Sequence, residues 1–280
     1  MNDSLESRRG QLLRHPVQTV DHPTVSLVIP AMNEEKNLPH VAARMPAGID
    51  EIILVDGNSS DETVSVAREL WPEVKVVLQT RRGKGNALAC GFAACTGDII
   101  VMIDADCSTD PAEIPRYVGA LVGGADFAKG SRFIQGGGSS DITRFRRWGN
   151  RLLNGFANAI YDTNYSDLCY GYNAFWRGAL SVFQLPAVEA TTPQWGDGFE
   201  IEALINVRVA AAGLQIAEVG SFEQDRLHGT SNLNAVSDGL RVLRTIWSER
   251  DKVSRARGLS VRASHVPAGA QLPVLQARVS

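Results

Sequence analysis

Short apolar runs alternate with helical segments through the first half of the chain, and this alternation most constrains the fold. Each run is rich in β-branched residues and ends in a polar cluster; the runs cover residues 25–30, 51–56, 74–78 and 99–103. Crossovers of about 15–20 residues separate them, which is long enough for one helix each. The pattern predicts an α/β fold with a Rossmann-like, mainly parallel sheet and helices on both faces.

The second half of the chain alternates less regularly. Its predicted elements are a strand at 126–133, a glycine-rich loop at 136–140, helices at 144–161 and 199–212, an edge strand at 214–219 and an amphipathic helix at 233–247. The polar first 22 residues and the charged, then Pro/Gly/Ala-rich end predict disorder. We therefore expect a disordered arm at 1–22, one domain at 23–248 and a flexible basic tail at 249–280.

Composition excludes several classes of protein. The net charge of −3 and a pI of about 6.0 argue against a general nucleic-acid binder. No apolar run approaches the roughly 18 residues that cross a bilayer, so a membrane-embedded enzyme is not expected. Four cysteines without a CxxC pair predict reduced thiols and a cytoplasmic protein. Contact with the inner face of the membrane stays open, and the oligomeric state has no signal.

Polar groups follow the predicted strands where each strand ends: Asn33 and Glu34, then Asp56, then Asp104 and Asp106. Because the carboxyl ends of parallel strands meet at one edge of a sheet, ligands bind there. The sequence thus predicts a polar site at this edge.

Asp104 and Asp106 directly follow a buried run, and two carboxylates at this spacing can face one divalent ion. Such a cation would neutralise a diphosphate leaving group. Asp56 can accept from a nucleobase N–H or a ribose hydroxyl, and Lys84, between two glycines, can offset phosphate charge. The alternative for Asp104 and Asp106 is a pair of solvated turn aspartates, and the alternative for Asp56 is a helix N-cap. The G-K-G segment alone is a weak signal.

Two further candidates lie later in the chain. His228, in a polar loop, is a candidate to ligate a metal or touch a diphosphate. Asp197 is a candidate general base, or a residue that favours a helix N-terminus. No Walker A or G-x-G-x-x-G motif follows the first strand, which disfavours P-loop and nicotinamide enzymes.

Arginines gather after the glycine-rich loop. Arg132 ends a predicted strand, and the segment 141–151 nets +3 in a chain that nets −3. Guanidinium groups bind phosphate in a bidentate manner. The same helix carries Trp148, Leu152 and other apolar residues, which suit either an interfacial helix or core packing.

Taken in order, four segments resemble family 2 glycosyltransferases of GT-A fold: 28–35 (VIPAMNEE), 55–61 (VDGNSSD), 82–85 (RGKG) and 104–106 (DAD). Further segments narrow the resemblance to the dolichol-phosphate mannosyltransferase and polyprenyl-phosphate glycosyltransferase branch: 130–133 (GSRF), 136–138 (GGG), Arg147 and 166–172 (SDLCYGY).

The resemblance implies inverting transfer of a hexose from a nucleotide-diphosphate sugar to a polyprenyl phosphate. It places Arg132 and Arg147 on the acceptor phosphate, and Mg²⁺ or Mn²⁺ on Asp104 and Asp106, with His228 or a water completing the ligands. The nucleotide-sugar pocket would comprise Pro30, Ala31, Asn33, Glu34, Asp56, Lys84, Asp104, Ala105 and Asp106. The chain departs from close relatives at Val55 and at Ser108, where they carry Asp and often Gln.

Three alternatives stay open. One keeps the fold and donor but transfers to a hydroxyl of a small metabolite or glycan, with Asp197 or Glu200 as base. Another is a sugar nucleotidyltransferase, which the acidic segment after the first strand disfavours. A non-catalytic sugar-binding protein is the third, and the Asp104/Asp106 pair argues against it.

Overall fold

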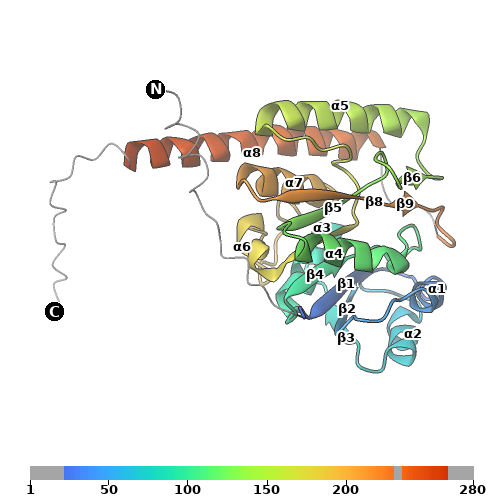
Figure 1. The fold of residues 1–280 in the computed structure, drawn as a ribbon. Coiled ribbons are helices and arrows are strands. Elements are labelled where there is room, and N and C mark those ends of the chain that lie inside the picture. The colour runs from blue at the N-terminus through green and yellow to red at the C-terminus, as the bar shows by residue number, and fades with distance from the viewer. Residues whose placement is uncertain (1–21, 230–234, 264–280) are drawn as a thin grey trace, which may run out of the picture.

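The computed structural model describes residues 22–229 and 235–263, with the side chains of 236–250 described in the last helix. In these residues a seven-stranded sheet has the order β3-β2-β1-β4-β7-β5-β8, and β6 and β9 form a separate two-stranded sheet. Figure 1 shows helices packed against both faces of the larger sheet. The predicted α/β fold with a mainly parallel sheet and helices on both faces is therefore confirmed.

The strands of the described residues are β1 (Val25–Ala31), β2 (Glu51–Asp56), β3 (Lys75–Leu78), β4 (Ile99–Met102), β5 (Phe127–Ser131), β6 (Gly138–Ser139), β7 (Asn173–Trp176), β8 (Ile216–Gly220) and β9 (Phe222–Glu223). Six of them lie close to their predicted positions, whereas β6, β7 and β9 were not predicted as strands. β1 pairs in parallel with both β2 and β4, and its central residues are fully buried. Burial on both faces explains why these strands read as continuous apolar runs.

Two layers of helices cover the sheet. The α-helices are α1 (Leu38–Ala43), α2 (Thr63–Leu70), α3 (Lys84–Ala94), α4 (Ile114–Val122), α5 (Arg144–Tyr161), α6 (Leu180–Phe183), α7 (Ile201–Ala211) and α8 (Ala235–Ala263). One core joins Leu27 and Ile29 of β1 to α1, α2 and α4. A second core, on the opposite face, joins Val28 to α3, α6 and α7. Alternate residues of β1 thus supply the two cores.

A third cluster lies outside these layers. Ala157 and Tyr161 of α5 pack with Val207 of α7 and with Val242 and Ile246 of α8. Figure 1 shows α5 and α8 running side by side along the top of the molecule, above α7. The helices predicted at 144–161 and 199–212 are therefore packed in one place.

Three features differ from the sequence prediction. β7 is antiparallel to both β4 and β5, and α4 was not predicted. Helix α8 reaches Ala263, past the boundary expected for a flexible tail at residue 249. The expected arm at 1–22 lies outside the described residues except at His22, and so does the tail beyond 263.

Glu51 ties the beginning of β2 to its neighbours, and this arrangement predicts a pH effect. Burial acts to raise the pKa of Glu51, but hydrogen bonds from Lys75, Ser26 and Thr96 outweigh it and lower the pKa to about 2. The folded pKa is below the ordinary value of 4.5, so this stabilisation is present above pH 4.5 and is lost as pH falls toward 2.

We expect Glu51→Gln to lower the free energy of unfolding by about 1 kcal/mol at pH 7 and to be nearly neutral at the acid end. Urea titrations of both proteins across this pH range measure the difference. An unchanged difference between pH 7 and pH 3 would contradict the assignment.

Candidate active site

The polar residues predicted at the strand ends do meet at one edge of the sheet. Ala31, at the end of β1, pairs in register with Asp56, at the end of β2. Asp104 and Asp106 follow β4, which pairs with the other side of β1. Pro30 lies on β1, and the side chains of Ala31 and Ala105 are buried in the first core. The parallel register therefore positions the candidate site.

Asp56 and Asn33 fix the loops at the β1–β2 end of this edge. The buried Asp56 carboxylate accepts from the backbone N–H of Ser59, and the Asn33 side-chain oxygen accepts from that of Ser60 at 2.8 Å. Asn33 has a positive φ of 61°, a conformation that Asn tolerates better than most residues. Asn33 thus joins the β1 loop to the β2–α2 loop.

A chain of alternating charges runs through the centre of the site. Lys84 Nζ, at the beginning of α3, lies 2.7 Å from Asp104 Oδ1 and 2.6 Å from Glu202 Oε1 of α7. Arg226 Nη1 lies 2.7 Å from Asp106 Oδ2. Burial opposes the charge of Lys84, but Asp104 and Glu202 outweigh it and raise the pKa of Lys84. Each of the two predicted metal carboxylates therefore has a cationic side chain as its partner.

Glu34 lies close enough to this cluster to interact electrostatically with its charged groups. Burial raises the pKa of Glu34, a hydrogen bond from Asn37 lowers it, and the charges of Asp106 and Asp104 raise it further. Three carboxylates thus concentrate negative potential at the end of β1 and β4. Such a site favours a hard cation over an unaccompanied anion.

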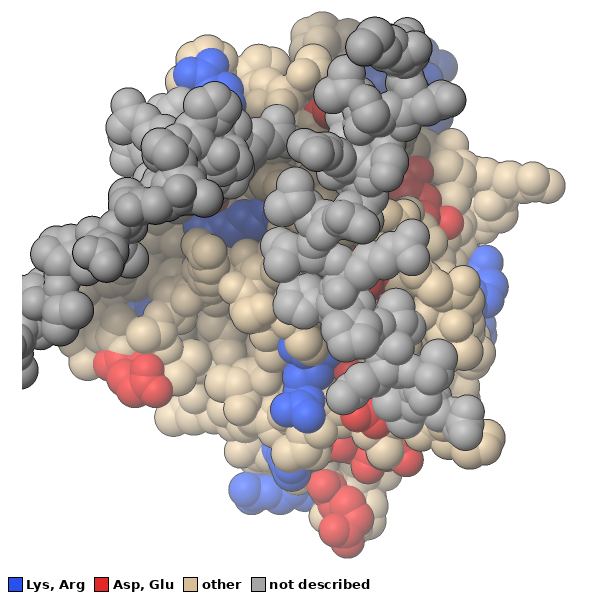
Figure 2. Space-filling view, turned by 60° about the vertical axis from the view of Figure 1, so that its left-hand side comes forward, with Lys and Arg blue, Asp and Glu red and all other residues tan. Residues whose placement is uncertain are grey.

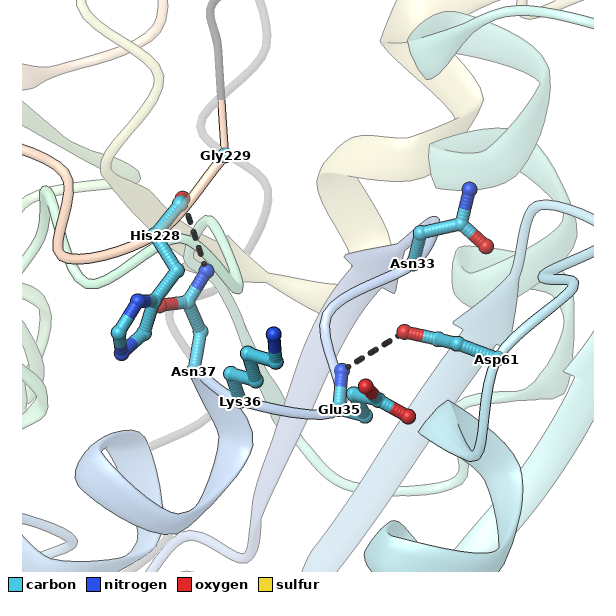
Figure 3. Close-up of a pocket in the computed structure, with 7 residues that line it drawn as sticks. All are labelled: Asn33, Glu35, Lys36, Asn37, Asp61, His228 and Gly229. Carbon is cyan, nitrogen blue, oxygen red and sulfur yellow. Dashed lines mark hydrogen bonds between the residues drawn. The ribbon is translucent and has the colours of Figure 1, made fainter.

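His228 lies beside this edge in a small polar pocket of about 290 Å³. Its backbone carbonyl accepts from Asn37 Nδ2 at 3.2 Å, and its ring centroid is 6.2 Å from that of His40. Figure 3 shows His228 across the pocket from Asn33 and Asp61, with Lys36 between them. No group of three or more His, Cys, Asp or Glu side chains is arranged as a metal site in the described residues. His228 as a metal ligand stays a prediction.

Asp197 is held in a buried ion pair. Its two carboxylate oxygens lie 2.8 Å from Arg81 Nε and Nη2, and both side chains are almost fully buried. Arg81 Nη1 also donates to the carbonyls of Ala187 and Ala190. The pair therefore ties the β3–α3 loop to the segment before α7. Because Arg81 and the Gln194 N–H engage both carboxylate oxygens, the arrangement favours a structural role for Asp197 over that of a general base.

The Asp197 backbone completes this connection. Its carbonyl accepts from Gly85 N–H at 2.8 Å, and Gly83 has a φ of +125°. A Cβ at Gly83 would collide with the same carbonyl, so this approach requires glycine. The glycines around Lys84 thus serve the contact between two loops.

We expect Asp197→Asn to act on stability rather than on proton transfer. Asn keeps one acceptor oxygen for Arg81 but removes the charge, so the free energy of unfolding should fall by about 2 kcal/mol. Urea denaturation measures this loss, and Glu189→Gln on the exposed neighbouring loop is the control. A stable variant whose pH–rate profile loses its acid limb would restore the general-base role.

A larger cleft of about 690 Å³ opens beside Lys84. Glu200 lines it and is 2% exposed. Its Oε1 accepts from Gly196 N–H at 3.0 Å, whereas Oε2 has no hydrogen-bond partner and lies 3.6 Å from Arg241 Nη1. A buried carboxylate oxygen without a hydrogen bond lowers the stability of the fold. Glu200 is therefore a candidate to accept a hydrogen bond from a bound ligand.

Arg132 is enclosed by two carboxylates. Nε and Nη2 contact Asp167 at 2.7 and 2.9 Å, and Nη1 contacts Glu223 at 3.0 Å. The guanidinium also lies 5.0 Å from the Tyr170 ring centroid. Since Nε, Nη1 and Nη2 all contact carboxylates and the side chain is only 5% exposed, the guanidinium is not presented to a phosphate in this arrangement.

Arg147 differs from Arg132 in its exposure. It is exposed on α5, and its guanidinium carbon lies 5.9 Å from the Phe133 ring centroid. The Arg132 guanidinium lies 5.6 Å from the same ring. Phe133 therefore places the two arginines on one side of the molecule, with only Arg147 accessible.

Sequence reasoning missed the partners of the predicted residues. Glu202, Arg226 and Arg81 had no assigned role, nor had Asp167, the partner of Arg132. Arg81 directly precedes the RGKG segment, and Asp167 lies within a segment that carried the resemblance, but neither position indicated an ion pair.

Solved structures with this fold include glucosyl-3-phosphoglycerate synthase from Mycobacterium tuberculosis in complex with Mn²⁺, UDP and glucosyl-3-phosphoglycerate. It is 26% identical, covers 82% of this chain and 81% of its own, and superposes with a TM-score of 0.61. The family described as "Glycosyl transferase family 2" matches residues 26–183. The chain belongs to this family.

Two curated relatives carry more specific names. Polyprenol monophosphomannose synthase of Mycolicibacterium smegmatis is 29% identical over 83% of this chain and 90% of its own. Undecaprenyl-phosphate 4-deoxy-4-formamido-L-arabinose transferase of Pseudomonas fluorescens is 36% identical over 46% of this chain. The match spans 40% of that relative's length. The resemblance to polyprenyl-phosphate sugar transferases is thus confirmed at the level of homology.

None of the described helices is both long and apolar enough to span a bilayer.

Proposed function

We propose that the protein transfers a hexose, with inversion, from a nucleotide-diphosphate sugar to a polyprenyl phosphate. The observation that carries the proposal is the meeting of Asp104, Asp106 and Lys84 at the strand ends, beside the loops braced by Asp56 and Asn33. The name of the mycobacterial relative, a polyprenol monophosphomannose synthase, supports the choice of acceptor.

The donor would occupy the edge between β1 and β2. Asp56 is 6% exposed and lies at the end of β2, where its carboxylate can accept from a base or ribose donor. Lys84 lies beside the expected diphosphate, where its charge would stabilise the leaving group. Glu34 would close the same pocket from the β1 loop.

The donor set at Asp104 and Asp106 fits a hard divalent cation. Both are carboxylates, which Mg²⁺ and Mn²⁺ prefer, and a cationic side chain already compensates each of them. We propose that these two residues hold the ion and that Arg226 leaves Asp106 to admit it. A bound divalent ion would neutralise charge on the departing nucleotide diphosphate.

A phosphate acceptor needs little help from a base. Its oxygen is already anionic, so it can form the new bond to the anomeric carbon while the bond to the diphosphate breaks, without a proton transfer. Arg147 is exposed and able to bind that phosphate, whereas Arg132 would position Asp167 and Glu223 beneath it. The engagement of Asp197 by Arg81 agrees with this reaction.

Glu200 favours a second candidate, transfer to a hydroxyl of a small metabolite. Glu200 lines the larger cleft and its Oε2 has no hydrogen-bond partner. The carboxylate can therefore accept a proton from an acceptor hydroxyl or a hydrogen bond from a sugar hydroxyl. The structural similarity to glucosyl-3-phosphoglycerate synthase supports this alternative.

Glu200→Gln separates the two acceptors. With a hydroxyl acceptor, loss of the base should lower kcat by about 10²–10⁴-fold and remove the acid limb of the pH profile. With a phosphate acceptor, we expect a change of about tenfold or less, mainly in donor KM. The assay uses UDP-, GDP- and dTDP-sugars with Mn²⁺, and a short polyprenyl phosphate or 3-phosphoglycerate. Absence of transfer to either acceptor from any donor would contradict both proposals.

A further inference from the structure

Helices α5 and α8 carry apolar residues on their exposed, outer surface as well as on the inner surface that packs against the protein. We define the α5/α8 face as the exposed residues Phe145, Trp148 and Leu152 of α5 and Leu240, Leu243 and Trp247 of α8. Each set repeats at intervals of three and four, so it forms one stripe along its helix. Trp148 is 61% exposed and Leu240 is 62% exposed.

Core packing does not account for these residues. The inner sides of the helices already supply the third cluster, through Ala157 and Tyr161 of α5 and Val242 and Ile246 of α8. The two outer stripes are continuous, because the rings of Phe156 and Trp247 stack in parallel with centroids 6.1 Å apart. The pair therefore presents a second apolar surface across both helices.

Arginines frame this apolar surface. Residues 144–161 contain no Asp or Glu, and Arg144, Arg147 and Arg151 are exposed beside the α5 stripe. On α8, the Arg250 guanidinium lies 4.0 Å from the Trp247 ring centroid. By contrast, basic and acidic side chains are interspersed on the face drawn in Figure 2. Aromatic and aliphatic residues bordered by arginine suit an anionic lipid interface.

A second copy of the chain fits this surface less well. Two-fold pairing of the α5/α8 face would bring the arginines of one α5 close to those of the other, and α5 itself carries no acidic residue to compensate them. An anionic bilayer supplies the opposite charge and accepts the tryptophans at its headgroup level.

We propose that the α5/α8 face docks the protein on an anionic membrane surface. The indole and leucine side chains enter the headgroup region, and the flanking arginines bind lipid phosphates. Arg147 belongs to α5 and lies next to Phe133, so docking would bring the membrane to the side where the two arginines meet. This proposal does not rest on the proposed reaction, since lipid binding needs neither donor nor acceptor.

Cosedimentation of the purified full chain with vesicles tests the proposal. We expect binding to phosphatidylcholine vesicles with about 30 mol% phosphatidylglycerol, and binding at least about tenfold weaker to phosphatidylcholine alone or at 1 M salt. Trp148→Glu with Leu240→Glu should weaken binding at least about tenfold. The matched control is Val122→Glu on α4, where Val122 is 57% exposed, and it should bind as the wild type does.

A second measurement keeps the test independent of folding. Brominated lipids should quench the tryptophan fluorescence of the wild type, and Trp148→Phe should lose part of that quenching while it still binds. The proposal is overturned if the wild type does not bind anionic vesicles, or if the double variant binds them with the affinity of the wild type. It is also overturned if light scattering shows that the wild type is a dimer and the double variant a monomer, while the wild type does not bind vesicles.

Discussion

Asp106→Asn should lower the rate of sugar transfer by about 10³-fold while the fold is retained. The substitution removes the charge that would hold a divalent ion on the departing diphosphate, and several kcal/mol of transition-state stabilisation correspond to this factor. Asn preserves the acceptor that Ser108 N–H uses at 3.0 Å. Arg226 loses its partner but is 34% exposed in its side chain, so water can solvate it at small cost.

Initial rates with and without EDTA, together with thermal shifts, measure this effect. Mn²⁺ with a nucleotide diphosphate at 100 times Kd should stabilise the wild type by about 2.7 kcal/mol and the variant by much less. Glu73→Gln, on the exposed turn before β3, is the control and should behave as the wild type does. Transfer that survives both EDTA and Asp106→Asn would remove the metal from the mechanism.

The positions of the candidate site residues were predictable because they follow from strand ends. β1, β2 and β4 are buried on both faces and therefore read as apolar runs, and parallel pairing then brings their ends together. β7 escaped prediction because it has four residues, follows a glycine-punctuated segment and reverses direction within the sheet. α4 was masked by Pro115 in its first turn and by Gly119.

The roles of the arginines and Asp197 were less predictable, since they depend on long-range partners. Arg81 and Asp197 are separated by 116 positions, and Arg132 and Asp167 by 35. A local pattern identifies an arginine at a strand end but does not indicate whether a carboxylate from another element has neutralised it. Burial of both partners decides between a binding group and a structural pair.

Arg132→Ala should therefore destabilise the fold more than Glu51→Gln or Asp197→Asn does. The guanidinium is 5% exposed in its side chain and compensates Asp167, which is fully buried, and Glu223. Its removal leaves two buried carboxylates without a compensating cation. Breaking a buried ion pair in this way costs about 3–5 kcal/mol. Urea denaturation at pH 7 measures the loss. Arg147→Ala, at an exposed position, is the matched control and should stay within about 0.5 kcal/mol of the wild type.

Substitutions of the two arginines should also differ in their effects on kinetics. Because Arg147 is exposed and can bind a phosphate, Arg147→Ala should raise the KM for polyprenyl phosphate by about tenfold, whereas the KM for an acceptor without a phosphate group should not change. Adding Asp167→Asn to Arg132→Ala should recover part of the lost stability, since it removes one of the stranded charges. If Arg132→Ala instead folds as stably as the wild type and loses transfer, the buried network is not structural. Arg132 would then have to leave its carboxylates to bind the acceptor.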